Sequence, residues 1–229
     1  MIIICNGGYR TGSTLTFNIC IKVAELNCEK VLSMGMNREP LIEFIKNHDL
    51  KEYWVIKSHD FICLEEYNPN IKIVHSCRHP LQAAASNLLL DKENKIYDIK
   101  KLVDRIVSQK NFLLKLKNRK DCLILNYNLL VNNLPKAIKK TTAFLDFPIV
   151  KQNIKNIAND LSRENVKKFC ENLEIDADSR TQFRKNHIKS FNFNIDYWKD
   201  ILSKDLIKII ASEIGLDYIN YFDKISRSN

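Results

Sequence analysis

The stretch "CNGGYRTGST" (residues 5–14) follows a short apolar run and precedes a segment with helical periodicity. Gly7 and Gly12 have the spacing of the glycines in the phosphate-binding pattern G-x-x-x-x-G-K-[ST], but Ser13 takes the place of the lysine. The nearest cation, Arg10, lies inside the loop. Glycines let backbone N–H groups turn inward, and a helix beginning near Ser13 adds free N–H donors. The stretch therefore predicts an anion-binding loop; the alternative is a tight strand-to-helix turn with a Ser or Thr cap.

Short apolar runs alternate with amphipathic segments around this loop. Runs rich in Ile and Val that do not strictly alternate are typical of parallel strands covered on both faces. We expect strands over Ile2–Cys5, Val31–Ser33, Tyr53–Lys57, Ile71–Ser76 and Cys122–Tyr127. We expect helices near 13–26, 38–48, 81–91, 98–118 and 134–145, and a helical, polar final third from about Pro148. This order predicts an α/β fold of three layers with a doubly wound parallel sheet, in one domain over residues 1–229.

Composition narrows the class of protein further. With 229 residues, 45% hydrophobic residues and only five Gly and five Pro, the chain can build a sizeable ordered core. The net charge of +9 indicates an anionic partner without identifying it. The seven cysteines form no C-x-x-C pair, which favours reduced thiols over disulfides or a zinc site. The start "MIII" is too short for a signal peptide, and no run approaches the roughly 20 apolar residues of a membrane span. We expect a cytoplasmic protein with no membrane span.

Two further segments place polar residues where strands are predicted to end. Lys57 and His59, in "VIKSHD", alternate with Ser58 and can face one cleft at the sheet's carboxyl edge. There a histidine can accept a proton near neutral pH, and a lysine can offset charge on a transferring group. Arg78 ends the next strand, and Ser86 follows two helical turns later, so the two can hold one phosphate from two sides. Ordinary surface polarity is the alternative for each segment.

A basic stretch near the C-terminus, "QFRKNHIK", carries Arg184 and Lys185. It predicts either a solvated basic turn or a segment that closes over an anion.

Together, and in this order, the segments resemble the sulfotransferases that use 3′-phosphoadenosine-5′-phosphosulfate (PAPS). Arg10-Thr11-Gly12-Ser13-Thr14 resembles their 5′-phosphosulfate loop, and Lys57-Ser58-His59 resembles their K-T-H strand end. Arg78 and Ser86 match the family's 3′-phosphate pair, Tyr127 resembles the tyrosine beside the adenine, and Arg184-Lys185 resembles the R-K-G segment.

The resemblance implies a P-loop NTPase-like α/β fold and a role for each matched residue. Arg10 would contact the leaving phosphate, and Thr11, Gly12, Ser13 and Thr14 would hold the 5′-phosphate. Lys57 would stabilise the sulfuryl group, and His59 would deprotonate a hydroxyl or amine acceptor. Arg78, Ser86, Arg184 and Lys185 would bind the 3′-phosphate, with Tyr127 by the adenine.

The product would be adenosine 3′,5′-bisphosphate (PAP), and no metal is required. The acceptor is a small molecule, a carbohydrate or a peptide, and the sequence leaves the oligomeric state open.

Three other functions remain open at this point. A P-loop kinase or nucleotide hydrolase would place a lysine at position 13 and an acid at a strand end for magnesium, where only Asp60 is near such an end. A binder of nucleic acid or acidic glycan would cluster its basic residues among aromatics, whereas here they are dispersed, so we expect no nucleic-acid partner. A catalytically inactive, sulfotransferase-like anion binder is the third.

Overall fold

The computed structural model describes residues 1–47, 52–60, 71–93, 98–185 and 196–227. The described strands form one parallel sheet in the order β2-β3-β1-β4-β5. Their bounds are β1 Ile2–Gly7, β2 Val31–Gly35, β3 Tyr53–Ser58, β4 Ile71–Cys77 and β5 Cys122–Asn126. The predicted α/β fold with a doubly wound parallel sheet is confirmed.

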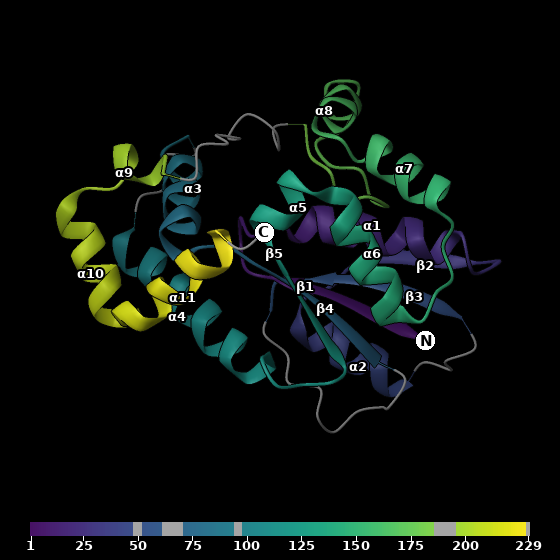
Figure 1. The fold of residues 1–229 in the computed structure, drawn as a ribbon, viewed down its shortest axis with the longest axis horizontal. Helices are drawn as coiled ribbons and strands as arrows, with labels where there is room; N and C mark the ends of the chain where they lie inside the picture. Colours follow the sequence, from purple (N-terminus) through teal and green to yellow (C-terminus); the bar gives the residue numbers. More distant parts are fainter. Residues whose placement is uncertain (48–51, 61–70, 94–97, 186–195, 228–229) are drawn as a thin grey trace.

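Helices lie on both faces of this sheet (Figure 1). In the first two thirds of the chain they are α1 Ser13–Glu25, α2 Arg38–Asn47, α3 Pro80–Glu93, α4 Ile99–Leu116, α5 Tyr127–Asn132 and α6 Leu134–Leu145. In the last third they are α7 Lys151–Asp160, α8 Arg163–Glu171, α9 Trp198–Ile201, α10 Lys204–Ile214 and α11 Leu216–Arg227. The predicted helical final third is therefore present, apart from residues that the structure does not describe.

Alternate residues of the central strand β1 supply two different cores, as the period of a strand requires. Ile3 and Cys5 pack with α1, α5 and α6 on one face. Ile2 and Ile4 pack with α2 and the last turns of α4 on the other. Figure 1 shows α1 and α6 on one side of the sheet and α2 on the opposite side. Both faces of β1 are thus buried, which explains its unbroken apolar run.

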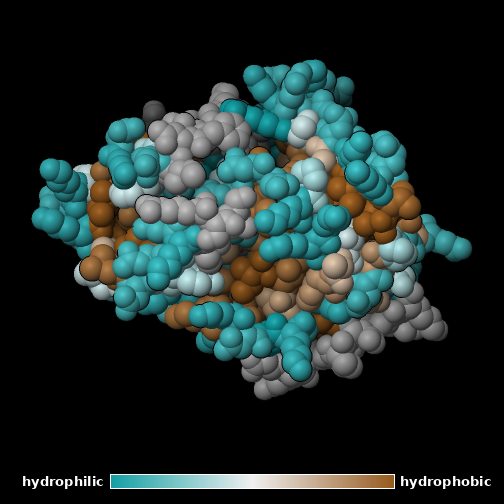
Figure 2. Space-filling view, viewed as in Figure 1, coloured by the Kyte–Doolittle hydropathy of each residue, from teal (hydrophilic) through white to brown (hydrophobic). Residues whose placement is uncertain are grey.

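A third apolar cluster joins α3 and α4 to the C-terminal helices α9, α10 and α11. Figure 1 shows these five helices grouped beside the sheet. In Figure 2 hydrophilic side chains are spread over the visible face, with hydrophobic ones in separate areas between them. None of the described helices is long and apolar enough to cross a bilayer.

The predicted strands differ from the observed ones by one or two residues at their carboxyl ends, and for one of them the difference moves a candidate site residue. The expected strand 122–127 ends at Asn126, and Tyr127 is already the first residue of α5. The Asn126 side chain accepts a hydrogen bond from the backbone N–H of Asn128, which is the contact of a helix N-cap. Tyr127 is therefore placed by the start of a helix, not by a strand.

The topology brings the candidate site residues to one edge of the sheet. From β1 the chain passes to β2 and β3 on one side and to β4 and β5 on the other. In such sheets ligands bind beyond the carboxyl ends of the strands, where the order reverses. Asn6 of β1 pairs with Ser58 of β3, and Gly7 of β1 pairs with Ser76 of β4, so the segments after all three strands begin together.

Candidate active site

The loop after β1 is fixed by close packing against β4. A Cβ atom added to Gly7 would lie 2.2 Å from Ser76 Oγ and 2.8 Å from Thr11 Oγ1. The Thr11 hydroxyl donates a hydrogen bond to the Gly8 carbonyl at 2.8 Å and lies 3.1 Å from Ser76 Oγ. Only a residue without a side chain at position 7 allows the loop to sit this close to β4.

The loop turns into α1 through left-handed backbone conformations at Arg10 (φ 66°) and Gly12 (φ 91°). Gly12 is the N-cap of α1 and provides no side-chain cap. The N–H groups of the first helical turn, including those of Ser13 and Thr14, are therefore donors directed along the helix axis into the loop. Ser13 and Thr14 are buried. The predicted loop geometry is present, and its binding role stays a prediction.

Lys57 reaches from β3 to this helix start. Its ammonium donates a hydrogen bond to Thr14 Oγ1 at 2.8 Å, and the residue is only 9% exposed. Burial, and then the charge of Arg184, lower the pKa of Lys57 from 10.5 to about 8. Near neutral pH the site thus contains a buried, protonated amine, and no carboxylate in the described chain forms an ion pair with it.

His59, just after β3, is held by the loop as well. Its Nδ1 lies 2.8 Å from the Gly7 carbonyl oxygen. Because a carbonyl only accepts hydrogen bonds, Nδ1 carries the proton, and Nε2 of the neutral ring keeps its lone pair. Burial, followed by the charge of Lys57, lowers the pKa of His59 to about 4. His59 is therefore neutral at physiological pH, in the tautomer that a proton acceptor at Nε2 requires.

Arg78 and Ser86 meet Arg10 at the other end of the loop. Arg78 Nη1 donates to the Arg10 carbonyl oxygen at 2.9 Å, and Arg10 Nε donates to Ser86 Oγ at 3.0 Å. Arg78 is 7% exposed, and its Nε is buried with no hydrogen-bond partner in the described structure. The guanidinium lies 3.8 Å from the centre of the Tyr127 ring. A buried cation with an unpaired donor is a position that an anion would complete.

Arg184 and Lys185 belong to a short hairpin. Ala177 pairs with Arg184 in an antiparallel bridge, and the Lys185 N–H donates to the Asp176 carbonyl oxygen at 3.0 Å. The positive charge of Arg184 contributes to lowering the pKa of both Lys57 and His59.

Among contacts of the described residues, none joins Arg184 or Lys185 to Arg78 or Ser86. Their shared role at a 3′-phosphate stays a prediction, and the rest of the basic stretch, 186–195, lies outside the described residues.

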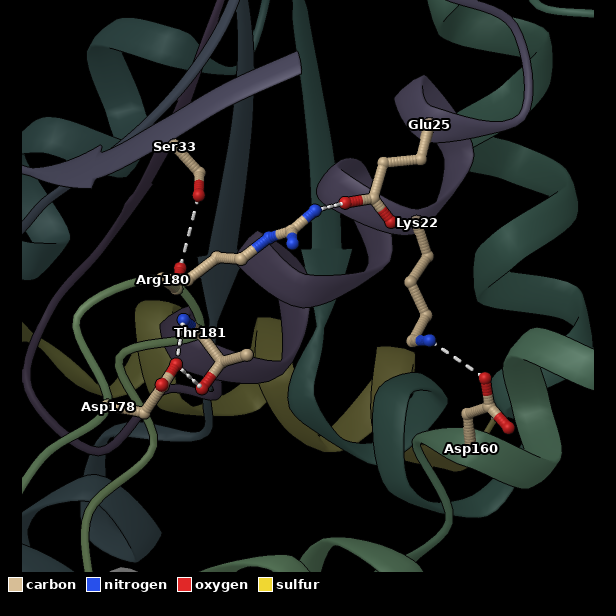
Figure 3. Close-up of polar contacts among 7 residues, drawn as sticks. All are labelled: Lys22, Glu25, Ser33, Asp160, Asp178, Arg180 and Thr181. Atoms are coloured by element: carbon tan, nitrogen blue, oxygen red, sulfur yellow. Dashed lines mark hydrogen bonds and ion pairs between the residues drawn. The ribbon is translucent and has the colours of Figure 1, made fainter. Parts of the chain in front are cut away.

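The hairpin is anchored to α1 and β2 (Figure 3). The figure shows Arg180 paired with Glu25 of α1, and Ser33 of β2 directed at the Arg180 carbonyl oxygen. Asn18 Nδ2 donates to the carbonyl oxygens of both Thr14 and Thr181 at 2.8 Å. These contacts connect the basic hairpin directly to α1, the helix that follows the loop.

Sequence reasoning missed two aromatic residues of the site. Tyr197 donates a hydrogen bond to the Gln82 carbonyl oxygen at 2.5 Å, and its ring centre lies 5.7 Å from the Arg78 guanidinium. Tyr9 stacks on His59. Tyr197 gave no local signal, whereas Tyr9 stands in the loop itself. The described residues contain no group of three or more His, Cys, Asp or Glu side chains able to hold a metal ion.

Known protein families and solved structures that are similar to this chain agree with this geometry. The family model described as the sulfotransferase domain matches residues 3–212. No curated protein sequence matches the chain closely enough to count as a relative.

Among solved structures, mouse sulfotransferase SULT7A1 complexed with PAP is similar with a TM-score of 0.67, at 13% identity, covering 97% of this chain and 88% of that one. Retinol dehydratase in a complex with retinol and PAP gives a TM-score of 0.61 at 16% identity, covering 95% and 81%. The sulfotransferase domain from the curacin biosynthetic pathway gives 0.51 at 18% identity, covering 94% and 97%. The family resemblance and the P-loop-like fold expected from the sequence are confirmed.

Proposed function

The chain belongs to the sulfotransferase domain family, and from that premise we propose that it transfers a sulfuryl group from PAPS to a hydroxyl or amine acceptor and releases PAP. The observation that carries the proposal is the buried Arg78, whose unpaired Nε lies in a cluster with Arg10 and Ser86. A triphosphate loop would need a lysine where Ser13 stands. In this chain the cation of the loop is Arg10, which lies three residues before Ser13.

The residues at the loop fit a donor with one phosphate at each end of its ribose. Arg78, with Ser86, would bind the 3′-phosphate, because a guanidinium matches phosphate oxygens and Nε lacks a partner. The N–H groups at the start of α1, with Thr11 and Thr14, would bind the 5′-phosphate. Tyr127, whose ring covers Arg78, would border the adenosine. Arg184 and Lys185 add positive charge from the hairpin.

When bound, PAPS supplies the sulfuryl group together with a phosphate as leaving group. His59 then accepts the proton of the acceptor hydroxyl at Nε2 as that oxygen bonds to sulfur. Lys57 and Arg10 offset the negative charge that develops on the sulfuryl and leaving oxygens as the sulfur–oxygen bond to phosphate breaks. Catalysis rests on orientation and fixed charge, and none of these steps needs a metal.

The acceptor is proposed as a small molecule carrying a hydroxyl group. Retinol dehydratase, whose fold is similar to that of this chain, has been solved in complexes with retinol and with androsterone. Labelled sulfate transfer from PAPS should be screened over phenols, sterols, sugars and peptides. If sulfate were transferred only to sugars or only to peptides, the proposed acceptor would be a carbohydrate or a peptide and not a small molecule.

Calorimetry with PAP and with ATP–magnesium tests the donor site. We expect PAP to bind and Arg78→Ala to weaken it by about tenfold to a hundredfold, because hydrogen bonds to a charged group contribute about 1.5–3 kcal/mol. Arg119→Ala is the charge-matched control, since Arg119 pairs with Asp121 at the opposite end of β5. Binding of ATP–magnesium without PAP would refute the proposal in favour of a kinase. PAP binding with no transfer to any acceptor would indicate an inactive anion binder.

A cytoplasmic location is part of the proposal. The cysteines of the described residues are all free, and Cys5, Cys20, Cys77 and Cys170 are buried. Buried reduced thiols suit a reducing compartment. Fractionation of the source cells with an antibody to the chain tests the location.

A further inference from the structure

Tyr9 stands in the loop directly before Arg10, and its ring lies flat against His59. The ring centres are 4.6 Å apart and the planes differ by 17°. This is the parallel arrangement of an aromatic stack. Tyr9 is still 49% exposed, so the contact with His59 is not a consequence of core packing.

The place of Tyr9 is set by two helices outside the loop. Its carbonyl oxygen lies 3.5 Å from Asn87 Nδ2 of α3 and 3.5 Å from Gln109 Nε2 of α4. One helical turn before Gln109, the Arg105 guanidinium lies 5.4 Å from the centre of the Tyr9 ring. The ring that covers His59 is therefore held by contacts from α3 and α4 through both its backbone and its π-face.

Within the described residues, the two contacts that orient the His59 imidazole come from Gly7, the last residue of β1, and from Tyr9 in the loop after it. The Gly7 carbonyl fixes Nδ1, but a single hydrogen bond leaves the ring free to tilt about that contact. The Tyr9 ring fixes the plane. Because Nδ1 is bound to the Gly7 carbonyl and one face of the ring lies on Tyr9, the direction in which Nε2 points is fixed.

We propose that Tyr9 is a positioning residue: its ring holds the imidazole of His59 in the orientation that presents Nε2 to the acceptor. This inference rests on the proposed function. It also couples the base to the donor loop, because Tyr9 and Arg10 are consecutive residues of that loop. The charged groups that act on His59 are Lys57, Asp60 and Arg184, and a substitution of Tyr9 leaves all three in place.

Three variants separate stacking from other roles of Tyr9. Tyr9→Phe and Tyr9→Trp keep an aromatic face, whereas Tyr9→Leu keeps bulk without one. Tyr221→Leu, at a partly exposed tyrosine of α11, is the matched control. The first readout is the titration midpoint of the His59 ring, followed by NMR in the free protein. The second is kcat and KM for PAPS with an acceptor from the screen of phenols, sterols, sugars and peptides.

We expect Tyr9→Leu to lower kcat about tenfold to a hundredfold, since a small misplacement of a catalytic group has that effect. KM for PAPS should change less than about threefold, because donor contacts remain. The His59 midpoint should rise toward 6.5, since burial is the main cause of its lowered pKa and one face becomes open to water. Tyr9→Phe, Tyr9→Trp and Tyr221→Leu should stay within about twofold of the unaltered protein in kcat.

Unchanged kcat and an unchanged His59 midpoint in Tyr9→Leu would overturn the inference, as would a loss confined to KM. A loss in Tyr9→Phe equal to that in Tyr9→Leu would also overturn it, because the hydroxyl and not the ring face would then matter. If the unaltered protein transfers no sulfuryl group to any acceptor, the proposed function fails and the positioning role fails with it. The NMR titration distinguishes these cases, since it reports the Tyr9–His59 contact without turnover.

Discussion

Replacing Lys57 by methionine should make the protein more stable at neutral pH while abolishing sulfuryl transfer. Lys57 is 9% exposed, and burial is the main reason that its pKa falls from 10.5 to about 8. At about 1.4 kcal/mol per pH unit, holding this amine protonated in the folded state opposes folding by about 3 kcal/mol. Loss of the hydrogen bond to Thr14 offsets about 1 kcal/mol of the gain. Lys57→Met should therefore raise the free energy of unfolding by about 2 kcal/mol at pH 7.

The gain should depend on pH in a definite direction. Below pH 8 Lys57 is protonated in both the folded and the unfolded chain, so its full unfavourable contribution is present. Between pH 8 and 10.5 the unfolded chain binds the extra proton, and the unaltered protein therefore becomes more stable as pH rises. The variant lacks this titration. At pH 10 the buried charge of Lys57 opposes folding by only about 1 kcal/mol. The lost hydrogen bond to Thr14 cancels that amount, so the stability advantage of the variant should shrink to about zero.

Urea unfolding at pH 7 and pH 10 measures the effect. Lys30→Met is the matched control, because the Lys30 side chain is 65% exposed and pairs with Glu52 at the surface. The control should change the free energy of unfolding by less than about 1 kcal/mol at either pH. A destabilised Lys57→Met variant at pH 7, or the same gain at both pH values, would refute the reasoning from buried charge.

Three other predictions test the loop, the base and the hairpin anchor. Gly7→Ala should lower the free energy of unfolding by about 1–3 kcal/mol in urea, because its Cβ meets Ser76 Oγ at 2.2 Å; an unaffected variant would contradict the close packing. His59→Ala should abolish transfer yet keep PAP binding by calorimetry, and in the unaltered protein the acidic limb of kcat/KM should lie near pH 4 and not near 6.5, because neutral His59 is the active form; an unchanged rate would remove His59 as the base. Asn18→Ala should weaken PAP binding by about tenfold and lower stability by about 1–2 kcal/mol, since it removes the hydrogen bond to Thr181; unchanged affinity would show that the hairpin acts independently of α1.

The elements of the sheet were predictable because local patterns determine them. Apolar runs gave the position of every described strand, and the boundaries moved by a residue or two, as at Tyr127. The loop followed from glycine spacing, and the beginning of α1 was expected near Ser13, where the structure has it. Helix and strand signals lie within a few residues of one another, so the sequence alone carries them.

The contacts within the site could not be predicted in the same way, because they join residues far apart in the chain. The hydrogen bond of Tyr197 with Gln82 spans 115 residues, and that of Arg10 with Ser86 spans 76. Motif matching placed Arg10 at the 5′-phosphate, yet its side chain also contacts the residue assigned to the 3′-phosphate. Such links depend on how α3 packs against α4 and the C-terminal helices, which no local pattern specifies.

The same buried charges explain why stability and the proposed function oppose each other at this edge of the sheet. Within the described part of the chain, Lys57 contacts a hydroxyl and Arg78 a carbonyl, and neither forms an ion pair with a carboxylate. Cations withdrawn from water without a counter-charge are unfavourable in the folded protein. A bound anion supplies the missing counter-charge, so the free energy that the buried cations cost in folding is recovered when the anion binds. Substitutions that stabilise the free protein should therefore concentrate at the positions where they abolish donor binding or transfer.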